Sequence, residues 1–251
     1  MRGLSPLLIS TFLVVTSCIP EVDSPPTTPQ RHDTITTGVK TSTTRESGSS
    51  TIATAETTTP LEGGPIDFGP KYGDILAVIG VSHDDALNLR SLPGPDHEIL
   101  EAIAPLSQDL IAQGETWELP GAFWLKVDSG GTIGWVHMGF VAYLGDTSDA
   151  TAFVVDDLNG YPVGDTMENL GQSVAEVFAS VDPRSDVVIV ASPTTGDLGE
   201  VTLDVIGLGD DATIGVRLHV FGEPTSEGFV LKAVELTDLC GRGVTTEGLC
   251  V

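Results

Sequence analysis

The chain has 251 residues, a formal net charge of −25 at pH 7 and a sequence pI near 4.1. From Asp67 to the end it carries 7 Lys and Arg against 30 Asp and Glu, so the acidity belongs to the part that we expect to fold. Nucleic-acid binding depends on Lys and Arg displacing counterions from phosphates, and this composition therefore excludes nucleic acid as a partner.

Residues 1–17 predict a secretory signal peptide. Arg2 precedes an apolar stretch from Leu4 to Val15, and small residues follow it. The stretch is interrupted by polar residues and falls short of the roughly 20 apolar residues that a transmembrane helix needs. We therefore expect an exported protein.

Val15-Thr16-Ser17-Cys18 resembles the lipobox of bacterial lipoproteins. The resemblance implies cleavage before Cys18 and attachment of diacylglycerol to its thiol. Membrane lipid is then a partner, and the protein is anchored on the extracytoplasmic side of the cell membrane. The alternative is an ordinary secreted protein whose Cys18 carries no lipid.

Residues 18–66 predict the lipidated cysteine followed by a disordered linker. The 48 residues after Cys18 contain 13 Thr and no Phe, Trp or Tyr. Such a segment cannot bury enough apolar surface to offset the entropy lost on folding. As a flexible coil it spans roughly 35 to 40 Å, so we expect a tether that holds the folded part away from the membrane.

Residues 67–145 predict a small β-barrel. Short alternating apolar runs are separated by Gly- and Pro-containing turns, which is typical of all-β structure. Strands are expected at 86–90, 123–127 and 132–137, and the last two form a hairpin.

Four short motifs in this region resemble the bacterial Src homology 3 domain family: Asn88-Leu89-Arg90, Pro93-Gly94, Trp124-Leu125-Lys126-Val127 and Gly134-Trp135-Val136. The resemblance implies a barrel with a shallow groove, lined by aromatic side chains, for extended peptides. The segment from Gln113 to Ala122 is longer than is usual in the family, and the resemblance implies that it is a loop beside this groove. Two candidate sets of ligand-binding residues follow: the aromatic residues Trp117, Trp124 and Tyr143, and the loop residues His83, Asp84 and Asp96. The alternative is that Trp124 and Trp135 fill the interior of the barrel.

Residues 150–251 predict an α+β domain, with Gly145 to Asp149 as the boundary before it. Apolar residues recur at steps of three and four from Met167 to Val181, which indicates an amphipathic helix. Asp165 and Glu168 have the spacing of a capping box, and Asp182-Pro183 ends the helix. Strands are expected at 186–191, 201–206, 213–221 and 229–236, which suggests a helix packed on an antiparallel sheet.

The predicted fold class is therefore mainly β with an α+β part. A disordered tether precedes a Src homology 3 like barrel, and the helix-on-sheet domain follows. If Cys18 carries the lipid, Cys240 and Cys250 remain as a pair in an oxidising compartment, where we expect a structural disulfide. A reactive or metal-binding thiol pair is the alternative.

We find no catalytic constellation in the sequence, since the five His residues are scattered and no Gly-x-Ser-x-Gly motif occurs. We expect a non-enzymatic binding module without cofactor or metal, whose ligand is a peptidoglycan peptide or an envelope protein. One alternative is a component of a cell-wall hydrolase system, in which Asp156, Asp157, Asp204 and Asp210 would converge in a pocket. The other is a structural or sensory lipoprotein without ligand.

Overall fold

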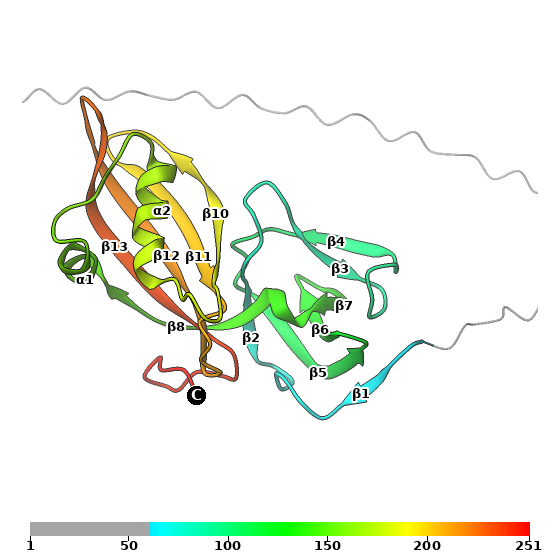
Figure 1. Cartoon of the computed structure of the whole chain (residues 1–251). Coiled ribbons are helices and arrows are strands. Elements are labelled where there is room, and N and C mark those ends of the chain that lie inside the picture. The colour runs from blue at the N-terminus through cyan, green and yellow to red at the C-terminus, as the bar shows by residue number, and fades with distance from the viewer. Residues whose placement is uncertain (1–60) are drawn as a thin grey trace, which may run out of the picture. The chain divides into compact units, whose positions relative to one another are not determined.

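The structure is a computed structural model that describes residues 61–251 (Figure 1). The predicted signal peptide, the lipidation site Cys18 and the linker as far as Pro60 lie outside the described residues. Between residues 61 and 251 the fold is mainly β, as predicted, and every strand pair is antiparallel. In that same range, neither α-helix is long and apolar enough to cross a bilayer.

The strands within residues 61–251 have these bounds: β1 (Gly64–Ile66), β2 (Ile75–Val78), β3 (Leu87–Arg90), β4 (Ile99–Ile103), β5 (Leu110–Leu119), β6 (Ala122–Ser129), β7 (Thr132–His137), β8 (Val141–Asp149), β9 (Val163–Gly164), β10 (Asp186–Thr194), β11 (Gly199–Ile206), β12 (Thr213–Thr225) and β13 (Gly228–Cys240). The helices are the 3-10 turn η1 (Met138–Phe140), α1 (Thr151–Asp157) and α2 (Met167–Phe178). Neighbouring strands follow the order β10-β11-β12-β13-β8-β2-β5-β6-β7-β3-β4, while β1 pairs with β5 and β9 with β13.

Strands β2 to β8 share one hydrophobic cluster, to which each of them contributes at least one buried aliphatic side chain. On β6 these side chains are Leu125 and Val127, and on β7 it is Val136. Because successive side chains of a strand point to opposite faces, Trp124 and Trp135 lie on the other face of the sheet. The alternative in which these two tryptophans fill the interior is therefore wrong, although both are buried.

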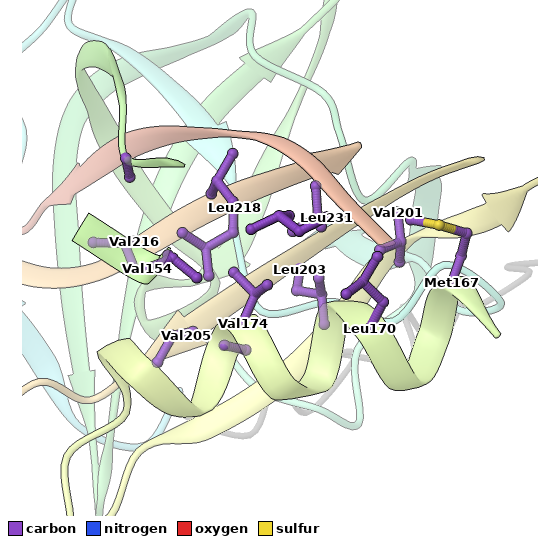
Figure 2. Packing of buried hydrophobic residues seen from close by; sticks show 14 residues of the cluster. Val154, Met167, Leu170, Val174, Val201, Leu203, Val205, Val216, Leu218 and Leu231 are labelled. Carbon is purple, nitrogen blue, oxygen red and sulfur yellow. The ribbon is translucent and has the colours of Figure 1, made fainter. Parts of the chain in front are cut away.

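The second hydrophobic cluster lies between the two α-helices and strands β11, β12 and β13 (Figure 2). Met167, Leu170 and Val174 on one side of α2 face Val201, Leu203 and Leu218 on the strands. All six are at most 2% exposed. This burial accounts for the apolar spacing that predicts the helix.

The ends of α2 differ from the sequence prediction. Its N-cap is Thr166, whose hydroxyl accepts the backbone N–H of Asn169 at 3.1 Å, rather than Asp165. The helix ends at Phe178, three residues before Val181, and Val181 is 91% exposed. Val181 is therefore not part of the buried side of the helix.

The predicted boundary from Gly145 to Asp149 is the second half of β8. The first half of that strand pairs with β2 through Ala142 and Ala77. The second half pairs with β13, as in the register of Asp149 with Glu235. One strand thus carries the sheet from one hydrophobic cluster to the other, and residues 61–251 belong to a single compact unit.

Two other segments are more ordered than the sequence predicts. Strand β1 lies inside the range assigned to the linker, pairs with β5 at residues 116–118, and so extends the fold before Asp67. The backbone carbonyl of Glu62 also accepts the indole N–H of Trp117 at 2.9 Å. The predicted loop from Gln113 to Ala122 is mostly β-hairpin, because β5 continues to Leu119 and β6 begins at Ala122.

The predicted disulfide between Cys240 and Cys250 is confirmed. Cys240 is fully buried at the end of β13, and Val244 and Cys250 form a β-bridge within the closed loop. The bond therefore attaches the last residues of the chain to the sheet.

Candidate functional site

A cavity of about 510 Å³ lies on the face of the sheet that carries Trp124. It is lined by the segment that leads into β3, by β3 itself, and by Pro95, Trp124, His137, Phe140 and Val188. We call it the Trp124 groove. Most of its lining is apolar or aromatic, as is usual in sites that take up organic ligands.

The aromatic side of the groove follows from strand register. Trp124 on β6 pairs with Trp117 on β5 and with His137 on β7, which places the three side chains on one face. The rings of Trp124 and His137 meet edge to face with centroids 5.7 Å apart. Phe140 of η1 continues the series at 5.4 Å from His137 and is 40% exposed. These rings offer a preorganised apolar surface to a ligand.

Polar groups of both signs line the same groove. The guanidinium of Arg90 donates to the carbonyl of His97 at 2.7 Å, which fixes its direction. The carboxylate of Asp85 accepts the backbone N–H of Ala86 at 2.8 Å. Asn88 adds an amide that both donates and accepts. The groove can therefore hydrogen-bond a ligand that carries both positive and negative groups.

The buried indole N–H of Trp124 has no hydrogen-bond partner among residues 61–251. Trp124 as a whole is only 5% exposed, so most of its ring is covered by other residues. An unpaired buried donor carries a free-energy cost of about 1–3 kcal/mol. The ring is thus held in place by its packing rather than by a hydrogen bond.

The segment from Gly80 to Ala86 is attached to strands β10 to β12. The backbone N–H of His83 donates to the carbonyl of Ile189 at 2.9 Å, and its ring lies 3.3 Å from the hydroxyl of Ser192. Val188, on the same strand as Ile189, completes the lining of the groove. The rim of the groove therefore depends on β10 as well as on β3.

A buried ion pair makes the second attachment of this segment. Nε of Arg217 donates a hydrogen bond to Oδ1 of Asp204 at 2.7 Å. The backbone N–H of Gly80 donates to Oδ2 of the same carboxylate at 2.8 Å. A second nitrogen of Arg217, Nη2, donates to the other carboxylate oxygen and to the carbonyl of Val78, each at 2.8 Å. Asp204 is fully buried and Arg217 is 6% exposed. The pair therefore connects β11 and β12 to the end of β2.

The predicted aromatic residues do not all meet in one place. Trp124 lines the groove, while Trp117 is its neighbour in the sheet and hydrogen-bonds Glu62. Tyr143 lies elsewhere: it packs against the interior cluster of β2 to β8 and donates its hydroxyl to Asp74 at 2.6 Å. Its burial and the Asp74 carboxylate raise the pKa of Tyr143 well above its ordinary value. The grouping of Tyr143 with Trp117 and Trp124 is therefore wrong.

The predicted loop residues lie near the groove without lining it. His83 is engaged with β10, and Asp84 accepts the hydroxyl of Ser82 at 2.6 Å, a bond that lowers the pKa of Asp84. Asp96 is exposed in the turn between β3 and β4, next to the lining residue Pro95. These polar residues border the Trp124 groove instead of forming its surface.

Sequence reasoning did not assign His137, Phe140 and Asp85 to the site. The sequence does not show how β6 and β7 are aligned. Only the register of these strands places His137 beside Trp124. Of the four aspartates considered for catalysis, Asp204 is bound to Arg217 and Gly80. Between residues 61 and 251, no three His, Cys, Asp or Glu side chains are grouped as a metal site requires.

Burial lowers the pKa of His137 below its ordinary value of 6.5. Its Nδ1 accepts the backbone N–H of Gly139 at 3.1 Å, which also favours the neutral ring. His137 therefore binds a proton more tightly in the unfolded chain than in the folded chain, and the free energy of unfolding falls as the pH drops below about 6.5.

We expect the urea midpoint to fall between pH 7.5 and pH 5.5, and His137→Gln to reduce this decrease. An equal decrease in the wild type and in His137→Gln would contradict the assignment.

No protein-family model matches the chain, and neither the curated proteins nor the solved structures contain a significant match.

Proposed function

We propose that this protein is a membrane-anchored extracytoplasmic lipoprotein that binds a cell-wall peptide in the Trp124 groove without catalysing a reaction. In this proposal β2 to β8 act as a Src homology 3 like barrel. The remaining strands, together with α2, support the rim of the Trp124 groove. The observation that carries the proposal is the aromatic series Trp124, His137 and Phe140 beside Arg90 and Asp85 in one cavity. Stacked rings give an extended peptide apolar contact, while the two charges orient it.

The charge of the groove supports a peptide in preference to an anionic polymer. The chain as a whole is strongly acidic, and Asp85 lines the groove itself. A ligand that carries amines as well as carboxylates matches Asp85 and Arg90 together. Peptides of the cell wall have this mixture of charges, and the anchor and tether would place the groove near them.

The test is retention of the full chain, extracted in detergent, by purified insoluble peptidoglycan at low salt. Phe140→Ala removes an exposed ring from the groove and should weaken retention about tenfold, which is the size of a typical aromatic contact in a binding site. Phe153→Ala is the matched control, because Phe153 is a 58% exposed phenylalanine of α1 outside the groove. It should leave retention unchanged.

Two outcomes would overturn the proposal. If the wild-type chain is not retained, or if the two phenylalanine variants lose retention equally, the groove is not a peptide site. The same preparation tests the anchor, since mass spectrometry should find diacylglycerol on Cys18 at the mature N-terminus. A free thiol at that position would exclude membrane anchoring by lipid.

A further inference from the structure

The lining residues of the Trp124 groove follow one another in an order that the strand pairing defines. Arg90 of β3 pairs with Trp135 of β7 and marks one end. His137 lies two residues later on the same face of β7, beside Trp124. Phe140 of η1 comes next, at 5.4 Å from His137. The groove therefore runs from Arg90 past the two aromatic strand residues to Phe140.

Gly80 and Val188 form the end of the groove beyond Phe140. The carbonyl of Phe140 accepts the backbone N–H of Ile79 at 3.0 Å, which brings Gly80 close to η1. The backbone N–H of Gly80 donates in turn to Asp204 at 2.8 Å. Asp204 of β11 is also the cross-strand neighbour of Val188 on β10. These contacts place Gly80 and Val188 together at this end.

The side chain of Val188 points into the groove because of its position on β10. Its neighbours Val187 and Ile189 pack against the hydrophobic cluster that α2 covers. Since successive side chains of a strand alternate between faces, Val188 points away from α2, where it lines the groove and is half-buried. Among the lining residues that the structure describes, Val188 alone comes from the part of the chain after β8.

The Val188 end of the groove is apolar. Val81 lines it beside Gly80 and is 6% exposed, and Phe140 adds an aromatic ring that is 40% exposed. The carboxylate and the guanidinium that line the groove come from the residue pair just before β3 and from β3 itself. The surface beside Val188 is therefore aliphatic and aromatic, and it favours an apolar group of a ligand.

The polar side chains close to this end are already engaged. Asp204 is fully buried, and Arg217 offsets its charge at 2.7 Å. The hydroxyl of Ser82 donates to the carboxylate of Asp84 at 2.6 Å. A charged group of a ligand that entered this end would lose hydration without gaining a partner there.

We propose that Val188 is a specificity-determining residue of the Trp124 groove, and that the groove selects peptides which place an uncharged aliphatic side chain against it. The inference rests on the proposed peptide binding and adds which side chain the peptide carries at one end. Contact with Val81, Phe140 and Val188 removes that side chain from water. Strands β10 to β13 and α2 then take part in the choice of ligand, because they hold Val188 at the groove.

The test measures retention of the full chain, extracted in detergent, by purified insoluble peptidoglycan. Val188→Thr keeps the volume of the side chain but adds a hydroxyl, and it should weaken retention about fivefold. Val188→Ile stays aliphatic and should remain within about twofold of the wild type. Val188→Phe fills this end with a ring and should weaken retention at least about tenfold.

Val181 supplies the matched controls, because it is 91% exposed and lies outside the groove. Val181→Thr and Val181→Phe should leave retention unchanged. Urea denaturation of every variant identifies any that does not fold. If Val188→Phe does not fold, the comparison of Val188→Thr with Val188→Ile decides the question.

The outcomes separate this inference from the proposed function. If the wild type is not retained, peptide binding itself is wrong and the inference is overturned with it. If the wild type is retained and Val188→Thr is retained equally well, only the selection of an aliphatic side chain is wrong. Equal losses in Val188→Thr and Val188→Ile, or in the Val188 and Val181 variants, would overturn the inference in the same way.

Discussion

Replacing Arg217 with Met is expected to lower the free energy of unfolding by about 3–5 kcal/mol, because it leaves a buried carboxylate without its counter-charge. Asp204 is fully buried, and Arg217 satisfies both of its oxygens. After the substitution only the backbone N–H of Gly80 still donates to it. The carbonyl of Val78 loses its side-chain donor at the same time. Urea denaturation followed by tryptophan fluorescence measures the loss.

The double variant Arg217→Met with Asp204→Leu tests the cause. It removes both charges, so most of the lost stability should return. Recovery should remain incomplete, because the backbone groups of Gly80 and Val78 then lack side-chain partners. Arg184→Met, at an exposed position, should stay within about 0.5 kcal/mol of the wild type. A loss below about 1 kcal/mol for Arg217→Met would show that water solvates the Asp204 carboxylate.

The ion pair is also expected to affect the Trp124 groove. Asp204 holds the backbone of Gly80, and Gly80 lines the groove. Loss of Arg217 is therefore expected to change the position of Gly80 on the rim of the groove, although the two residues are more than a hundred positions apart in the sequence. The pair thus contributes to the position of the rim of the Trp124 groove as well as to stability.

The features of the fold that sequence patterns predict well are local. Alternation in Trp124-Leu125-Lys126-Val127 and in the run from Thr132 to His137 correctly predicts two paired strands. The apolar spacing from Met167 onward predicts α2, because those side chains face the sheet. The cysteine count, once Cys18 is set aside, predicts the disulfide.

Features that depend on long-range pairing could not be predicted in this way. Gly145 to Asp149 has the composition of a loop, yet the backbone hydrogen bonds of β13 hold it in an extended conformation. Strand β1 contains Gly and Pro and shows no alternation, and it forms because the edge of β5 is available. Arg217 and Asp204 each look like outward-facing charges on a strand, whereas in the structure both are buried.

The candidate site likewise contains one residue that a local motif identifies and others that depend on long-range strand pairing. Trp124 could be singled out from its motif, but its partners His137 and Phe140 depend on the register of β6 with β7 and on the turn η1. Tyr143 has the right residue type, and its hydrogen bond to Asp74 places it in a different cavity. Residue type alone therefore identified one member of the aromatic series.

Replacing Trp124 with Ala is expected to lower the free energy of unfolding by about 3–5 kcal/mol, as for other buried tryptophans. The variant should also lose retention by peptidoglycan, because Trp124 forms part of the groove and supports His137 at 5.7 Å. Urea denaturation, followed by circular dichroism because the fluorophore itself is changed, measures the first effect. The sedimentation assay measures the second.

Trp124→Phe separates ring packing from hydrogen bonding. It removes an indole N–H that has no acceptor among residues 61–251, and so relieves a cost of about 1–3 kcal/mol while it loses part of the ring contact. The two effects oppose each other, and we expect a net change within about 1 kcal/mol of the wild type. Retention by peptidoglycan should be largely preserved, because an aromatic ring still supports His137. If the Phe variant is as unstable as the Ala variant, the indole N–H has a partner in solution and contributes to the fold through a hydrogen bond.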